Sequence, residues 1–303
     1  MLRSEWEQLP TEMKAGYCQG IESRVERAAF QQLVCFEGLE TAVFIVDGEE
    51  FAFVPADEAV IGYDPSAPIP QVFLDLLTYE WCDVLGQDDV RKELRRVLSP
   101  RRRGQCREML VERYMSEVWW EKGGLGLPIS GGITMPLDEG GSDFDVVRRI
   151  VDTLRPLGWD ILTEDEWEYL AGGICPTILS PHLMGLLAKD PKTVKSNSIC
   201  ADASRGTRWD PGPGGRLSPA ENWSKLNVLN SFGLWLNQGG PNEVVNAECL
   251  MKNGDGACAS CGGYEAFDAV VASPHYRYAP PRSEFVVPME YFCLRRVIPL
   301  GSA

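Results

Sequence analysis

Histidine is scarce in this sequence, and basic residues are outnumbered by acidic ones. The 303 residues include only two histidines, His182 and His275, so a metal site built from three histidine ligands cannot be assembled. Lysine and arginine total 29 against 44 aspartate and glutamate residues, which gives a formal net charge of −15. Because an acidic surface repels the phosphate backbone, we expect no nucleic-acid partner.

Long apolar runs are also missing. No stretch of about 18 apolar residues occurs that could cross a bilayer, and the residues after Met1 lack the apolar core of a signal peptide. We therefore expect no membrane partner and a cytoplasmic location. In that compartment most of the ten cysteines are expected to be reduced thiols.

The first part of the chain has patterns of both helix and strand. Apolar spacing predicts a helix over residues 22–34. Residues 41–46 and 50–54 flank an Asp-Gly pair and predict a β-hairpin. Residues 66–120 have a mostly helical pattern, whereas the glycine-rich residues 121–142 are predicted to be loop.

Helix signals continue to about residue 171, and short strand patterns follow. Residues 144–154 place their apolar side chains on one helical face. Thr163 and Glu166 form a capping box that opens a helix over residues 164–171. Beyond residue 195, short strands separated by Gly, Pro and Asn dominate. Helices followed by irregular strands favour an α+β fold.

One distinctive segment of the chain is Leu162-Thr-Glu-Asp-Glu-Trp-Glu-Tyr-Leu-Ala-Gly-Gly173. Together with four other stretches, which follow the same order, it resembles the formylglycine-generating enzyme family, also called sulfatase-modifying factors, and it is the most diagnostic of these motifs. Phe53-Val-Pro-Ala-Asp-Glu-Ala-Val-Ile-Gly62 resembles the opening strand of the family, and Asn230-Ser-Phe-Gly-Leu-Trp235 resembles a later motif. Gly262-Gly263-Tyr264 and Tyr291-Phe292-Cys293-Leu294-Arg295 correspond to the last motifs.

The resemblance implies a fold and a domain division. It implies a modified C-type-lectin-like fold of the α+β class, with short irregular strands held by buried aromatic residues. The family-like domain would span residues 41–303 and contain a helical insertion near residues 66–120. Residues 1–40 would form an N-terminal helical extension packed on the core. Within the diagnostic segment, we expect Trp167 to be buried scaffold.

The family's oxidative chemistry is not expected here. Members that oxidise a substrate cysteine bind copper through two cysteines after the Gly-Gly motif, and those positions fall near Phe267 and Ala272. Neither side chain supplies the thiolate that cuprous copper requires. Related sulfoxide synthases use three histidines on iron, more than this chain contains. The resemblance therefore implies a member without catalytic residues.

Two kinds of site remain as candidates. A ligand groove is expected on the irregular loops, since Tyr, Trp and Arg dominate binding hot spots; its candidate residues, which core packing explains equally well, are Trp235, His275, Tyr276, Arg277, Tyr278 and Arg282. Cys249, Cys258 and Cys261 are candidate ligands of a structural zinc ion, with Cys200 or His275 as the fourth. Plain reduced thiols and a redox pair are the alternatives for these cysteines.

A calcium site is a further candidate, because the family binds calcium near the place that Glu243 occupies here. The sequence retains one acidic ligand, and calcium needs six to eight oxygens. We therefore favour a solvated loop at this position.

These observations predict a non-catalytic domain that binds a protein or peptide. Family analogy adds bacterial signalling or defence assemblies as its setting. The alternative is a metal-dependent oxidoreductase that uses Cys258, Cys261 and His275 on a peptide or small thiol substrate. A third interpretation is a structural subunit whose acidic surface docks a basic partner.

Overall fold

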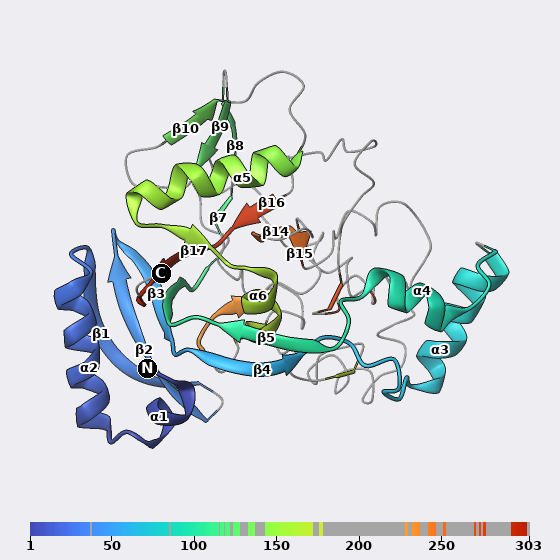
Figure 1. Ribbon diagram of the computed structural model, residues 1–303, viewed down its shortest axis with the longest axis horizontal. Helices are drawn as coiled ribbons and strands as arrows, with labels where there is room; N and C mark the ends of the chain where they lie inside the picture. Colours follow the sequence, from blue (N-terminus) through green and yellow to red (C-terminus); the bar gives the residue numbers. More distant parts are fainter. Residues whose placement is uncertain are drawn as a thin grey trace.

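The computed structural model of the chain is shown in Figure 1. It describes residues 1–36, 38–84, 86–114, 116–117, 119–121, 124–127, 133–136, 143–171, 176–177, 228–229, 232–236, 242–246, 251–252, 270, 273, 275–276 and 292–301. The described elements are helices and mostly antiparallel strands, so the fold belongs to the α+β class that the sequence predicted.

A six-stranded antiparallel sheet is the largest sheet of the described structure (Figure 1). Its strand order is β1-β2-β3-β6-β17-β11. In that order the strands are β1 (Ala28–Phe36), β2 (Leu39–Val46), β3 (Glu49–Val54), β6 (Met109–Glu112), β17 (Arg296–Pro299) and β11 (Asp160–Ile161). Because β17 lies between β6 and β11, the sheet joins the beginning, middle and end of the chain.

Smaller sheets surround the main one. β4 (Asp57–Ile61) pairs with β5 (Arg102–Cys106). One further sheet contains β8 (Trp119–Glu121), β9 (Gly124–Leu127) and β10 (Ile133–Pro136), and β12 (Val228–Leu229) pairs with β13 (Trp235–Leu236). The last has the order β15-β14-β16-β7, from β15 (Met251–Lys252), β14 (Asn242–Val244), β16 (Phe292–Leu294) and β7 (Ser116–Glu117).

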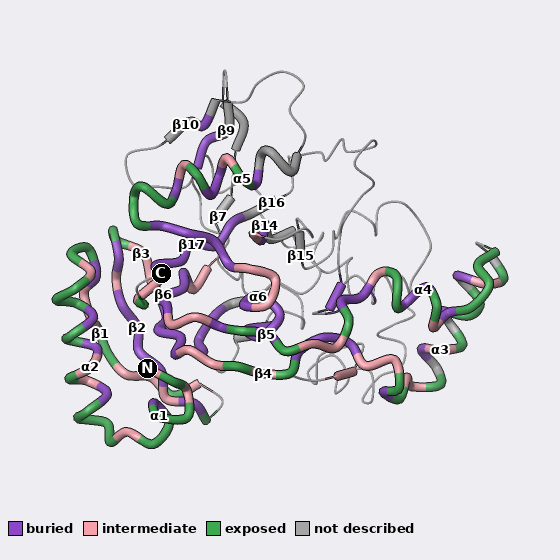
Figure 2. Tube along the Cα trace, in the orientation of Figure 1, coloured by how far each residue is buried: buried purple, intermediate pink, exposed green. Residues whose placement is uncertain are grey.

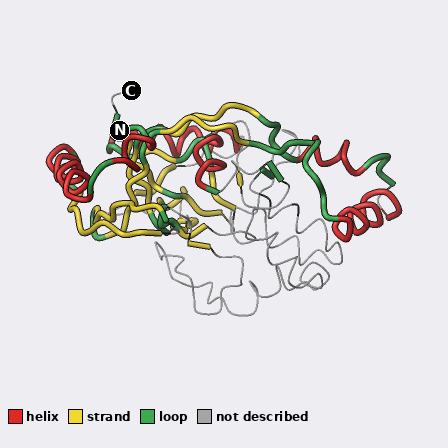
Figure 3. The backbone as a smooth tube through the Cα atoms, turned by 90° about the horizontal axis from the view of Figure 1, so that it is seen from below, coloured by secondary structure: helices red, strands yellow, loops and turns green. Residues whose placement is uncertain are grey.

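The helices lie in two regions. Near the main sheet are α1 (Arg3–Gln8), α2 (Thr11–Arg24), α5 (Asp143–Leu154), the 3₁₀ helix η2 (Arg155–Leu157) and α6 (Glu164–Leu170). A helical arm contains α3 (Gln71–Leu77), the π-helix η1 (Thr78–Val84) and α4 (Val90–Val97). Figures 1 and 3 show this arm at the opposite end of the molecule from α2. In the described part of the chain, no helix is both long and apolar enough to cross a membrane.

Aromatic side chains cover one face of the main sheet, which we call the aromatic face. Phe44 and Phe51 are opposite each other in register and Phe53 lies two residues further on, so all three point to the same side. Trp6, from α1, has its ring 4.7 Å from that of Phe53, and the Trp159 ring is 5.6 Å from that of Phe51. The N-terminal helices and the segment after α5 therefore pack on the aromatic face.

Several predicted elements are confirmed. The hairpin is formed by β2 and β3, and its turn residues Asp47 and Gly48 have φ of 51° and 85°, as a two-residue type I′ turn requires. Helix α5 begins at Asp143 and ends at Leu154, and its apolar stripe is buried from Val147 onward.

The helix predicted over residues 22–34 is wrong. Helix α2 ends at Arg24, and β1 begins at Ala28 and pairs with β2. Phe30, Leu33 and Val34 have the spacing of a helical face, but they lie on both faces of a strand that contains a bulge after Phe30. Periodicity could not distinguish the two because pairing with a distant segment decided the outcome.

Two other segments contain more strand than expected. Within residues 66–120 the helices end at Val97, and β5, β6, β7 and β8 follow. Strand β6 has four consecutive buried residues and therefore lacks the alternation that identifies a strand. The glycine-rich residues 121–142, predicted as loop, contain the β9–β10 hairpin, whose register is fixed by cross-strand pairing.

Candidate functional site

Helix α6, in the segment that resembles the enzyme family, is anchored by its N-terminal cap. The Thr163 hydroxyl accepts a hydrogen bond from the Glu166 backbone N–H at 3.2 Å, and the Glu166 carboxylate accepts one from the Thr163 N–H at 2.8 Å. The predicted capping box is thus confirmed. Trp167 is only 1% exposed, as a scaffold residue would be.

Arg102 of β5 is surrounded by carboxylates of α6. Its guanidinium lies 2.7 Å from Asp165, 3.1 Å from Glu168 and 3.6 Å from Glu164. Burial alone would lower the pKa of Arg102, but these three carboxylates raise it above its usual value. One cation is thus shared among three anions, which leaves this part of the site negatively charged.

A second guanidinium, that of Arg107, joins α6 to the main sheet. It contacts Asp160 of β11 and Glu166 of α6, each at 2.7 Å. Burial raises the pKa of Glu166 even though Arg107 lowers it. Ionisation of Glu166 therefore costs free energy in the folded protein.

Tyr169 links α6 to β4. Its hydroxyl donates a hydrogen bond to Asp57 at 2.6 Å and accepts one from Arg3 at 2.9 Å. Burial, together with the hydrogen bond to Asp57, raises the pKa of Tyr169 above its usual value. This chain of contacts fixes α6 against both β4 and the N-terminal segment.

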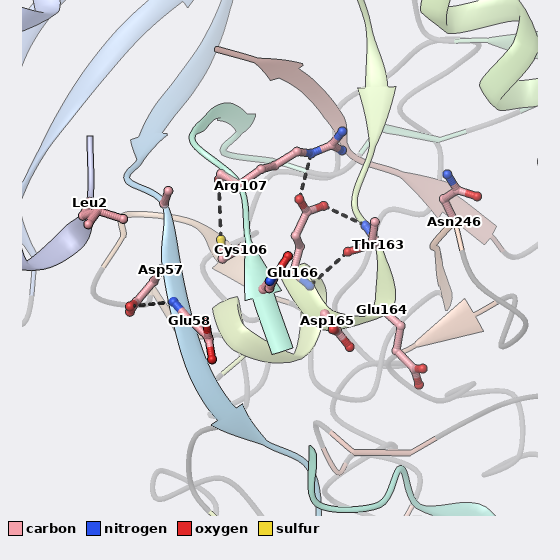
Figure 4. Close-up of a pocket in the computed structure, with 12 residues that line it drawn as sticks. Leu2, Asp57, Glu58, Cys106, Arg107, Thr163, Glu164, Asp165, Glu166 and Asn246 are labelled. Atoms are coloured by element: carbon pink, nitrogen blue, oxygen red, sulfur yellow. Dashed lines mark hydrogen bonds and ion pairs between the residues drawn. The ribbon is translucent and has the colours of Figure 1, made fainter. Parts of the chain in front are cut away.

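These contacts surround a pocket of about 670 Å³, which Figure 4 shows in close-up and which we call the acidic pocket. Its lining residues come from the N-terminal segment, β4, β5, α6 and the segment after β14, and they are Leu2, Ala56, Asp57, Glu58, Gln105, Cys106, Arg107, Thr163, Glu164, Asp165, Glu166 and Asn246. Five of them are acidic and one is basic. The pocket is suited to a cationic group.

Cys106 also lines the acidic pocket, but its thiol has the properties of a structural residue. The side chain is buried, and burial raises its pKa well above the usual value. The neighbouring carboxylates Glu166 and Asp57 raise the pKa further. Because the thiolate is the reactive form, this environment opposes nucleophilic use of Cys106.

The predicted ligand groove is described only in part. His275 and Tyr276 are both buried, which favours core packing over a position on a groove for these two candidates. The His275 ring nitrogen Nδ1 lies 3.9 Å from Glu168, and the His275 carbonyl accepts a hydrogen bond from the Ser99 N–H at 2.7 Å. These contacts favour the structural interpretation of His275. Trp235 is placed in β13 by its backbone; Arg277, Tyr278 and Arg282 lie outside the described residues.

Most of the predicted metal ligands lie outside the described residues, so the predicted zinc site stays a prediction. Glu243 is placed in β14 by its backbone, and Cys249, Cys258 and Cys261 lie outside the described residues. Among residues that are described, no group of three or more His, Cys, Asp or Glu side chains could hold a metal ion. The four described thiols are free: Cys18, Cys35, Cys82 and Cys106.

Sequence reasoning missed the acidic pocket. A basic run such as Arg101-Arg102-Arg103 is typical of a solvated turn, but Arg102 is an internal partner of α6 and, of the three, only Arg103 is largely exposed. The available signal was the match between this basic run and the acidic run from Glu164 to Glu168. Arg102 and Glu168 are 66 positions apart in the chain, so the sequence alone does not show that the two runs meet.

Three of the segments that resemble the enzyme family converge at α6. Tyr169 of α6 contacts Asp57 from the first segment and packs its ring 5.6 Å from that of Phe232 in the third.

Comparison of the chain with models of protein families, with curated proteins and with solved structures finds no match. Membership of the formylglycine-generating enzyme family therefore stays a prediction.

Proposed function

We propose that this protein is a non-catalytic, formylglycine-generating-enzyme-like domain that binds a basic segment of a partner protein or peptide. The observation that carries the proposal is the acidic pocket beside α6, in which carboxylates outnumber guanidinium groups. The proposed fold is the modified C-type-lectin-like arrangement that the sequence resemblance implies.

The contacts of α6 support the family part of the proposal. The diagnostic segment forms a capped helix with a buried Trp167, which is a scaffold role. The segment that resembles the opening strand supplies β4 and is held against α6 by Asp57. Segments far apart in sequence thus meet around one short helix, which is the arrangement expected if they form one structural unit.

The charge of the acidic pocket supports a basic segment as the proposed ligand. Arg102 and Arg107 cannot neutralise the carboxylates that contact them, because Arg102 faces three and Arg107 faces two. Leu2 and Ala56 add apolar surface to the same pocket. A lysine or arginine side chain matches both features, since its apolar stem lies along apolar surface while its charge meets carboxylates.

The sequence is the ground on which we expect no oxidative catalysis of the family's kind. The two copper positions fall near Phe267 and Ala272, and two histidines cannot complete a three-histidine iron site. Incubation with a cysteine peptide of the sulfatase type, copper and oxygen should leave the peptide mass unchanged. Conversion of the cysteine to an aldehyde would contradict a non-catalytic role.

Peptide binding tests the proposal directly. Fluorescence anisotropy would compare a lysine- and arginine-rich peptide with a peptide of equal length in which those residues are glutamine. The basic peptide should bind. Its affinity should fall as salt is added, because salt screens the attraction between exposed charges. Glu58→Gln removes a rim carboxylate that is 54% exposed and whose ion-pair partner among the described residues is the exposed Arg103, so it should weaken binding without unfolding the protein.

Glu12→Gln is the matched control, because Glu12 is exposed on α2 and does not line the acidic pocket. Both variants lose one negative charge, so a general charge effect would weaken binding equally in both. Equal affinity of the basic and glutamine peptides would refute the proposed ligand.

A further inference from the structure

Strand β1 is an outer edge of the main sheet. Its only described strand partner is β2, and among the described residues the one other backbone hydrogen bond at β1 is local, from the Ala28 N–H to the Val25 carbonyl. Helix α2 lies beside β1 (Figure 1), and its Tyr17 ring packs against Phe53 on the aromatic face. No strand in the described part of the chain pairs with the outer side of β1, and the main-chain donors and acceptors there could pair with an extended segment.

The composition of β1 does not protect this edge. Its sequence, Ala-Ala-Phe-Gln-Gln-Leu-Val-Cys-Phe, contains no charged residue and no proline over nine residues. Charged side chains and proline are the usual devices that prevent edge strands from pairing with other chains. The only protective feature of β1 is a bulge at Gln31, where the register of its pairing with β2 shifts.

Burial indicates that β1 is incompletely covered. Its neighbour β2 is almost wholly buried, whereas Ala28 is the only buried residue of β1, a difference that Figure 2 shows along the two strands. The large apolar residues Phe30, Leu33, Val34 and Phe36 are each only partly buried. A strand added outside β1 would shield apolar surface on both faces of the sheet as well as the backbone.

We propose that β1 pairs antiparallel with β1 of a second copy of this chain, across a two-fold axis. An antiparallel strand pair obeys two-fold symmetry, so two equal edges satisfy each other over their full length. Charge favours this surface: copies that each carry −15 repel one another over most of their surfaces, and β1 is a long uncharged segment where they can approach. The inference does not depend on the proposed peptide-binding function.

A single strand pair is a small interface, so we expect a weak dimer that dissociates on dilution, in roughly the micromolar range. Sedimentation velocity on the full chain at increasing concentration would measure it. Gln32→Lys places like charges near each other across the axis and should raise the dissociation constant about tenfold. Gln32 is exposed, so the change should not affect folding.

Gln87→Lys is the matched control, because Gln87 is exposed near the helical arm, away from β1. This variant should dimerise like the parent protein. Gln32→Glu is a second test, in case the lysine variant misfolds. Amide exchange over residues 28–36 should slow as the dimer forms.

Two results would overturn the proposal. A parent protein that stays monomeric at every concentration has no self-pairing edge. A dimer that both folded Gln32 variants leave unchanged must use a different surface.

Discussion

Replacing Arg102 by methionine tests whether charge pairing at α6 holds the site together. The substitution keeps an unbranched side chain and removes the cation that faces Glu164, Asp165 and Glu168. Glu168 is fully buried, so its carboxylate would lose an ion-pair partner without gaining access to water. Three neighbouring carboxylates would then also repel one another.

The loss of stability expected for Arg102→Met depends on how deeply the ion pairs of Arg102 are buried. Removing one partner of a buried ion pair costs about 3–5 kcal/mol. The Arg102 side chain is 22% exposed and that of Asp165 is 34% exposed, so water recovers part of this energy. We therefore expect a loss of about 2–4 kcal/mol in the free energy of unfolding, measured by urea denaturation. Thermal melting should show a fall in Tm of roughly 4–10 °C.

The neighbouring residue supplies a matched control. Arg103→Met makes the same change at a side chain that is 83% exposed and pairs with the exposed Glu58. An exposed pair contributes about 0–1 kcal/mol, so this variant should be nearly as stable as the parent. If the two variants lose equal stability, or if Arg102→Met loses less than about 1 kcal/mol, the carboxylates do not depend on Arg102 and our account of the site is wrong.

Other predictions concern folding around the same region. Trp167→Ala should cost about 3–5 kcal/mol in urea denaturation, because the indole is 1% exposed; a loss under about 1 kcal/mol would contradict its scaffold role. Gly62→Ala should cost about 2 kcal/mol or more, since φ is +95° and the new Cβ would lie 2.1 Å from the Pro100 carbonyl oxygen. Gly16→Ala, in open space on α2, should instead stabilise by about 0.5–1 kcal/mol. Burial raises the pKa of Glu166, so the stability that its protonated form provides is lost as pH rises through that pKa. Glu166→Gln keeps a capping side chain, and its Tm relative to the parent should therefore rise as pH increases above about 4, the usual pKa of a glutamate; a pH-independent difference would refute this assignment.

Local sequence was sufficient where neighbouring residues decide the conformation. The Asp47-Gly48 turn and the Thr163–Glu166 capping box depend on contacts within a few residues, and both are present as predicted. The class of the fold also followed from the order of helical and strand patterns along the chain.

Tertiary structure decided what depends on distant partners. Residues 28–34 have a helical spacing of apolar residues, yet pairing with β2 makes them part of a strand. The acidic pocket was hidden in the sequence because Arg102, Asp57 and α6 come from separate segments, and the charge of each segment alone indicates only a polar surface. Only folding sets these charges at contact distance and removes water from between them, and that desolvation turns ordinary surface residue types into a site.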